Sequence, residues 1–195
     1  MLTKPLKLIL SIIMLFSVAI VNSQEQNELA YFKYVPDKWR SEIINFPLDF
    51  APSLKYKGRL ELLFSPGMFK GESEEFLSYG FIWAIEGSDV PTPEQLEQDL
   101  KTYYYGLQSI VSEGKLKAKA NSRVWLDESS SGSDLSYLGI VEWTEPFVTK
   151  SAQKLNLKVT FRVNKENNQW QAFFRVSPQQ IDHSIWTKLE ELPIN

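Results

Sequence analysis

The sequence predicts a single α+β domain, in which an antiparallel sheet of about six strands carries two amphipathic helices packed on one face. Two helix start signals, near Thr92 and Ser177, bracket four segments with strand patterns and short connections. Consecutive strands with short connections pair as an antiparallel meander. The composition, with 43% hydrophobic and 23% charged residues, is typical of a folded globular chain.

The N-terminus has the pattern of an export signal. Lys4 and Lys7 precede an uncharged apolar run from Leu8 to Val21, and small residues follow up to Ser23. The run is shorter than the roughly 20 residues that a membrane-spanning helix needs. We therefore expect a signal peptide over residues 1–23 and export to the periplasm or the medium. An uncleaved membrane anchor is the alternative.

The mature chain is expected to begin with an irregular part. Residues 24–57 are predicted to form a lead-in and a covering segment, and residues 58–195 the domain itself. Pro47 and Pro52 interrupt this part, so we expect extended coil from Trp39 to Pro52. The coil would lie over the domain.

Two strands are predicted next. The segment from Arg59 to Phe64 alternates in polarity and ends in the turn signal Ser65-Pro66-Gly67. The segment from Phe76 to Ile85 is apolar on both phases. A strand of that kind is normally central and covered on both sides.

The clearest element is a helix in the middle of the chain. Thr92-Pro93-Glu94-Gln95 combines an N-cap, a proline at the first helical position and a capping box. Apolar residues then recur at spacings of three and four, and Gly114 lies where the helix should stop. The same start signal returns at Ser177-Pro178-Gln179-Gln180, followed by Ile181, Ile185 and Leu189 on one face. This pattern predicts a second, C-terminal helix.

The region between the helices is predicted to form a meander of four strands: Ser122–Asp127, Leu135–Trp143, Leu155–Val163 and Gln169–Val176. Matching the apolar faces of the last two strands places Phe161 opposite Ala172 and Val163 opposite Trp170. Residues 165–168 then form a hairpin loop.

Composition and motifs disfavour several functions. The chain has a formal net charge of −3 and lacks the basic runs that phosphate binding requires, so we expect no nucleic-acid partner. It has no cysteine and one histidine, His183, which excludes disulfides, thiolate chemistry and multi-histidine metal sites. No serine-elbow, zinc-protease or phosphate-loop motif is present. We expect His183 to be a solvated surface residue and the protein to need no cofactor.

Carboxylates leave two possibilities for chemistry open. Glu61, Glu86 and Glu142 are associated with strands, and a glycosidase needs only two carboxylates that face one sugar bond. The simpler interpretation is that they flank strands and face water. The loop from Asp127 to Asp134 matches the first half of a calcium loop, but Leu138 stands where the bidentate glutamate belongs. We expect a hairpin tip there and no metal site.

Strand alternation predicts a candidate binding site on the sheet face away from the helices. Its aromatic platforms and convergent polar groups are typical of a ligand site. The predicted ligand-binding residues are Arg123, Trp125, Glu142, Lys158, Arg162, Phe173 and Arg175. The predicted register places Lys158 opposite Arg175, which suggests surplus positive charge for an anionic or hydroxyl-rich ligand, with Trp125 and Phe173 as stacking platforms. The alternative is that the segment from Trp39 to Leu54 covers part of this face.

Several short motifs resemble those of a group of uncharacterised exported bacterial proteins with no known activity. The motifs are Trp39-x-x-Glu42, Phe50-Ala51-Pro52, Phe64-Ser65-Pro66-Gly67-Met68-Phe69, Ser78-Tyr79 and Tyr103-Tyr104-x-Gly106-Leu107. The resemblance covers about the first two-thirds of the mature chain and implies no activity.

These observations favour an exported, non-catalytic binding or interaction module that uses the aromatic and basic sheet face. Its partner would be a small molecule, a glycan or an envelope protein. The first alternative is a carboxylate-dependent hydrolase that acts on carbohydrate. The second is a structural subunit of an envelope complex.

Overall fold

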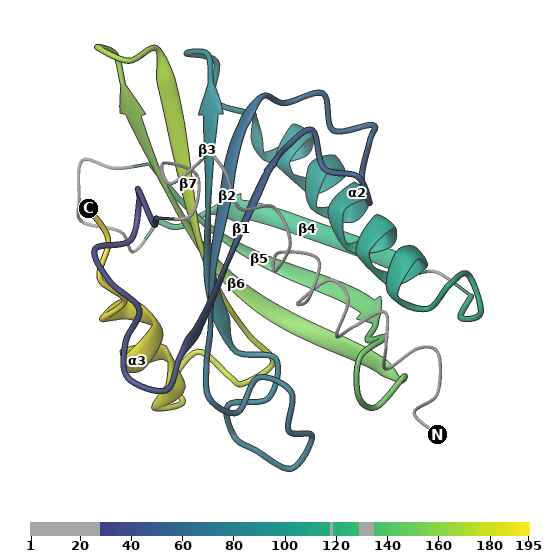
Figure 1. Cartoon of the computed structure of the whole chain (residues 1–195). Helices are drawn as coiled ribbons and strands as arrows, with labels where there is room; N and C mark the ends of the chain where they lie inside the picture. The colour runs from purple at the N-terminus through teal and green to yellow at the C-terminus, as the bar shows by residue number, and fades with distance from the viewer. Residues whose placement is uncertain (1–27, 118, 129–134) are drawn as a thin grey trace, which may run out of the picture.

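Seven antiparallel strands form one open sheet in the computed structural model, which describes residues 28–117, 119–128 and 135–195. The strand order across the sheet is β1-β2-β3-β7-β6-β5-β4 (Figure 1). The strands are β1 (Arg40–Phe46), β2 (Gly58–Phe64), β3 (Tyr79–Glu86), β4 (Ala120–Leu126), β5 (Leu135–Thr144), β6 (Ala152–Asn164) and β7 (Gln169–Ser177).

The predicted C-terminal meander is confirmed. Strands β4 to β7 pair in sequence order, and β6 and β7 pair with Phe161 opposite Ala172 and Val163 opposite Trp170. The hairpin loop between them spans residues 165–168, as the matching of apolar faces predicts. The register is determined because a shift by one residue would turn every apolar side chain to the opposite face.

Strand β1 is the seventh strand, which the sequence analysis missed. The interpretation of Trp39 to Pro52 as extended coil is wrong, because Arg40–Phe46 pairs with β2 along its whole length. Pro47 follows the strand and therefore ends it without interrupting its hydrogen bonds. The weak alternation of β1 is tolerated because an edge strand has only one neighbour to match.

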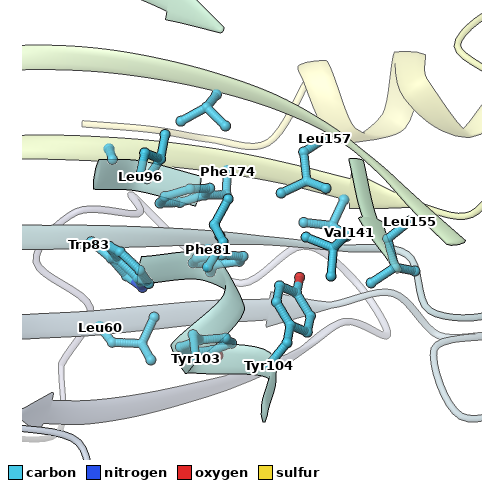
Figure 2. Packing of buried hydrophobic residues seen from close by; sticks show 14 of the residues in the cluster. Leu60, Phe81, Trp83, Leu96, Tyr103, Tyr104, Val141, Leu155, Leu157 and Phe174 are labelled. Atoms are coloured by element: carbon cyan, nitrogen blue, oxygen red, sulfur yellow. The ribbon is translucent and has the colours of Figure 1, made fainter. Parts of the chain in front are cut away.

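Helix α2 (Pro93–Val111) begins as predicted, with the Thr92 hydroxyl accepting a hydrogen bond from the Gln95 backbone N–H. Its apolar side packs on one sheet face, which we call the α2 face and which includes Leu60, Phe81, Trp83, Val141, Leu155, Leu157 and Phe174. Figure 2 shows Tyr103 and Tyr104 of the helix against these residues. Phe81 stacks on Phe174 with ring centroids 4.3 Å apart. This layer is the larger of the two hydrophobic clusters.

Helix α3 (Ile185–Glu190) lies on the opposite face of the sheet (Figure 1), so the prediction that both helices pack on one face is wrong. We call this side the second face. Ile185, Trp186 and Leu189 pack there with Ile82 of β3 and Phe173 of β7. Both strands are apolar on both phases in this region, so each side of the sheet needs cover.

The C-terminal helix also starts later than predicted. Ser177 remains in β7, and its hydroxyl lies 2.8 Å from the Ser78 hydroxyl, so it does not cap a helix. His183 has that role in part, because its Nδ1 accepts a hydrogen bond from the Ile185 backbone N–H at 3.1 Å. Ser177 and Pro178 therefore form the end of β7 and the turn that follows it, and α3 begins only at Ile185.

The segment after β1 packs against the buried residues of α2. Phe50 meets Tyr103 edge to face, with ring centroids 5.2 Å apart. Gly106 allows this approach, because a Cβ at that position would lie 1.9 Å from the Phe50 carbonyl oxygen. The residues just before β1 lie on the second face instead, where Phe32 bridges to Ile194 near the C-terminal end of the chain.

Helix α2 also covers the β4 edge of the sheet. The Glu97 carboxylate accepts a hydrogen bond of 2.7 Å from the Val124 backbone N–H, and the Ser122 hydroxyl donates to the Glu97 carbonyl oxygen. Within the described ranges, no segment pairs with the outer edge of β1.

Candidate functional site

The seven predicted ligand-binding residues all lie on the second face, as strand alternation predicts. One row across the sheet runs through Trp125, Leu138, Lys158 and Arg175, which are successive partners on β4, β5, β6 and β7. The like charges of Lys158 and Arg175 are directly opposite one another in the ladder. The structure therefore confirms the register from which the site was predicted.

The cover over this face divides the seven residues into two groups. Arg162, Phe173 and Arg175 lie next to α3 and the C-terminal segment. Phe173 is only 5% exposed, packs on Phe32 with ring centroids 5.8 Å apart, and has the Arg175 guanidinium 3.9 Å from its ring centre. Both sides of Phe173 are thus in use within the fold, so it presents no stacking surface to a ligand.

Lys158 marks the border between the two groups. Its Nζ forms an ion pair with the Glu190 carboxylate of α3 and lies 5.4 Å from the Trp186 ring centre. The acidic residue of β5 on this face, Glu142, is opposite Lys154 in the ladder and not opposite Lys158. Lys158 therefore helps to hold α3 on the sheet.

The remaining predicted residues, Arg123, Trp125 and Glu142, are exposed on the part of the second face that no described segment covers. Together with their neighbours they form what we call the open strip: Asn121, Arg123, Trp125, Leu138, Ile140, Glu142 and Lys154. Trp125 is 43% exposed, and the partly exposed Leu138 lies directly beside it in the ladder. The strip combines an aromatic platform, an apolar floor and charged groups of both signs.

A shallow depression of about 240 Å³ lies at one end of the open strip. Its lining includes Asn121, Arg123, Ile140, Glu142 and Lys154. Asn121 and Lys154 were missing from the predicted site. Each lies one residue before the predicted start of its strand, because β4 and β6 begin earlier than the sequence pattern predicts.

The candidate carboxylates do not converge on one another. Glu61 is completely buried, lies 2.9 Å from Arg59 Nε, and accepts hydrogen bonds from the backbone N–H groups of Ala30, Tyr31 and Phe32. Glu61 on β2 and Glu142 on β5 are four strand positions apart, which corresponds to about 19 Å. Glu86 and Glu142 are three positions apart, or about 14 Å. Glycosidase carboxylates lie about 5–10 Å from one another.

A second buried carboxylate, Glu145, has a comparable structural use. It accepts hydrogen bonds from the backbone N–H groups of Phe147, Val148 and Thr149 and from the Thr149 hydroxyl. These contacts fix the loop between β5 and β6, so Glu145 is not available to a substrate.

Most of the resemblance motifs lie on the α2 face, away from the open strip, whereas Trp39 packs against the hydrophobic cluster of the second face. Tyr79 and Tyr104 share a hydrogen bond of 2.6 Å, and burial raises the pKa of both hydroxyls. Phe50, Tyr103 and Gly106 form the contact between α2 and the segment after β1. Glu42 projects onto the same α2 face, and burial raises its pKa. The motifs are thus largely accounted for by packing.

Among the described residues, no group of three or more histidine, aspartate or glutamate side chains could hold a metal ion. The calcium-like loop of the sequence analysis falls mostly on residues 129–134, which lie outside the described residues.

The open strip is therefore the candidate functional surface of the described chain. Comparison of the chain with protein-family models, curated proteins and solved structures finds no match.

Proposed function

We propose that the protein is an exported, non-catalytic binding module and that its open strip binds a hydroxyl-rich chain, such as a polysaccharide. The observation that carries this proposal is the exposed Trp125 ring on an uncovered β-sheet surface, with hydrogen-bonding side chains in the neighbouring rows. Asn121, Glu142 and Lys154 form one such row, and Arg123 lies between this row and Trp125.

The chemistry of the strip suits sugars. An aromatic face provides contact area for the apolar face of a pyranose ring, while amide, carboxylate and cationic groups hydrogen-bond to hydroxyls. The side chains of Arg123, Glu142 and Lys154 form no hydrogen bond or ion pair within the described part of the chain, so their polar groups are available to a ligand. A shallow, extended surface favours a chain over a compact small molecule, which prefers an enclosed pocket.

The hydrolase alternative has less support. A glycosidase requires two carboxylates on either side of one bond, and the open strip contains Glu142 alone. The separations of about 14 Å and 19 Å from Glu86 and Glu61 exceed the range that such a pair needs. Binding without cleavage is the function that this arrangement favours.

An envelope protein is the second candidate partner. Leu126 and Leu135 are 52% and 40% exposed and flank the β4–β5 connection near Trp125. Both leucines share the α2 face with Tyr137 and Phe161, opposite to Trp125, so they form a separate apolar patch that a protein could bury. This candidate would place the binding energy on the leucines, whereas the polysaccharide proposal places it on Trp125 and the polar row.

Export is part of the proposal. The described residues contain no helix long and apolar enough to cross a bilayer. We expect the mature chain to begin at Gln24, and intact-mass measurement on periplasmic and medium fractions tests this. Recovery of the chain only from the membrane fraction, with Met1 attached, would contradict it.

Affinity electrophoresis tests the binding proposal. Native gels containing xylan, mixed-linkage β-glucan, pectin or alginate should retard the wild-type protein in at least one case, and Trp125→Ala should weaken that retardation about tenfold. Tyr105→Ala is the matched control, because Tyr105 is 53% exposed on α2, outside the open strip.

Two outcomes would overturn the polysaccharide proposal. One is the absence of retardation by any of the four polymers. The other is equal loss in the Trp125 and Tyr105 variants. Retention of polysaccharide binding in the double variant Leu126→Ser and Leu135→Ser would count against the protein-partner alternative.

A further inference from the structure

A small cavity lies on the second face at the other side of Lys158, beneath the C-terminal segment. Its volume is about 30 Å³, and its lining includes Thr160, Arg162, Gln171, Phe173, Arg175 and Ile194. A cavity needs about 10–15 Å³ to hold one water molecule. This cavity therefore has room for one or two groups of the size of a water molecule. Two of its lining residues, Arg162 and Arg175, are cationic.

Arg175 is the central cation of the cavity. Its Nε donates to the Leu189 carbonyl oxygen at 3.2 Å, and its Nη1 donates to the Thr160 hydroxyl at 3.4 Å. Its planar group also covers the Phe173 ring at 3.9 Å. All these partners are neutral. In the part of the chain that the structure describes, no carboxylate lies within 4 Å of this guanidinium.

The charges nearby increase the need for a negative partner. Burial lowers the pKa of Arg175 to about 10, with Glu190 opposing and Arg162 adding to that shift. Glu190, the acid that opposes this shift, forms its ion pair with Lys158 and not with Arg175. Arg175 remains charged at neutral pH, and a charge withdrawn from water is costly unless a counter-charge approaches it.

We infer that the cavity binds one monovalent anion of about the size of chloride, held by Arg175 and by the Thr160 hydroxyl. Thr160 Oγ1 accepts from Arg175, which leaves its own proton to donate to the anion. Phe173 and Ile194 provide apolar walls beside the guanidinium, which strengthen its attraction for an anion. A volume of about 30 Å³ suits an ion of the size of chloride better than phosphate, sulfate or a sugar.

The anion would act as a tie between the sheet and the chain ends. Arg162, on the cavity wall, donates to the Asn195 carbonyl oxygen at 3.3 Å, and Asn195 Nδ2 donates to the Ala30 carbonyl oxygen. Occupancy of the cavity would therefore stabilise β6, β7 and both terminal segments together. This inference does not depend on the polysaccharide proposal, because it concerns a different part of the second face.

Chloride-35 NMR tests the inference directly. At pH 7, the wild-type protein should broaden the chloride signal, and sodium bromide should reverse the broadening. Arg175→Gln should abolish it, and Thr160→Val, which keeps the β-branched shape without the hydroxyl, should reduce it. Arg123→Gln is the matched control, because it removes a second-face arginine outside the cavity and should leave the broadening unchanged.

Thermal melting provides the second measurement, with sodium gluconate holding the ionic strength constant. Replacing gluconate by chloride should raise the Tm of the wild-type protein and of Arg123→Gln by about 3–5 °C, and that of Thr160→Val by less. Broadening that falls equally in the Arg123 and Arg175 variants would overturn the inference. So would a bromide-soaked crystal of the wild-type protein that has water in the cavity and no anomalous peak.

Discussion

Glu42 differs from the buried carboxylates among the described residues in its lack of hydrogen-bond partners. Glu61 and Glu145 are surrounded by backbone N–H donors, and Asp99 accepts hydrogen bonds from Tyr56 and Gln95. Glu42, by contrast, accepts no hydrogen bond and forms no ion pair with any described residue. Burial raises the pKa of Glu42, and burial, Tyr79 and the Glu42 charge together raise the pKa of Tyr103.

A raised carboxyl pKa predicts a specific pH dependence. The folded state binds the Glu42 proton more tightly than the unfolded state, so this residue lowers stability progressively as the pH rises through its folded pKa. Glu42→Gln should therefore increase the free energy of unfolding at pH 7 by about 1 kcal/mol. The gain should disappear below the unfolded pKa of glutamate.

Urea denaturation at pH 7 and pH 4 checks this expectation. Glu142→Gln, on the exposed open strip, is the matched control and should change stability by less than about 0.5 kcal/mol at either pH. A loss of stability in Glu42→Gln at pH 7 would show that the carboxylate has a stabilising partner.

At the scale of elements, the contact between α2 and the segment after β1 depends on one missing side chain. Glycine in the interior of a helix ordinarily costs about 1 kcal/mol relative to alanine. At position 106 glycine is favoured over alanine, because a Cβ there would lie 1.9 Å from the Phe50 carbonyl oxygen. The backbone of one element must shift before alanine can fit.

We predict that Gly106→Ala lowers the free energy of unfolding by about 2–4 kcal/mol, because backbone atoms cannot yield as a flexible side chain can. Gly71→Ala is the control, since a Cβ there meets only side-chain methyl groups at 3.7 Å. Thermal melting of the two variants measures the difference. Equal melting temperatures would mean that the segment after β1 adjusts freely.

The elements also show which features local sequence determines. Alternation from Leu155 to Val163 and from Gln169 to Val176 was sufficient to predict two strands and their register, because each strand has one strongly apolar face. Strand β1 was missed because its pattern is weak and two prolines follow it. The position of α3 was missed although β3 was expected to be covered on both sides, a condition that two helices on one face do not satisfy.

The candidate site was predictable only in part for a related reason. Alternation places Trp125 and Phe173 on the same face, and it does so correctly. Their different exposures depend on which strands α3 and the chain ends cover, and contacts of that range leave no periodic trace in the sequence. The same limitation concealed the partner of Lys158, which lies on a helix 32 residues further along the chain.

At the scale of the whole molecule, the first and last described segments meet on the second face. Phe32 bridges to Ile194, and the Lys33 N–H donates to the Pro193 carbonyl oxygen at 2.7 Å. Glu61 holds the N-terminal side of this junction through three backbone N–H groups and through Arg59. One buried carboxylate thus connects the sheet to both ends of the described chain.

Glu61→Ala should release this junction. It removes the acceptor of three amides and leaves the mostly buried Arg59 without its partner, so we expect a loss of about 3–5 kcal/mol. Hydrogen exchange should then accelerate at the amides of residues 30–33 and 194–195, while the amides of β5 keep their protection. Uniform acceleration across the sheet would show that the terminal segments do not open separately.

The hydrogen bond between Glu97 and Val124 has a consequence for self-association. For copies of a protein to polymerise by sheet extension, both edge strands of each copy must have unpaired backbone N–H and C=O groups. Each copy then pairs with one neighbour through each edge. Here α2 occupies the outer side of β4, and only β1 is left unpaired among the described strands. Pairing of β1 with β1 of a second molecule would complete a symmetric dimer and leave no edge for a third. Because α2 covers the β4 edge, association through the sheet stops at a dimer and does not continue into a fibre.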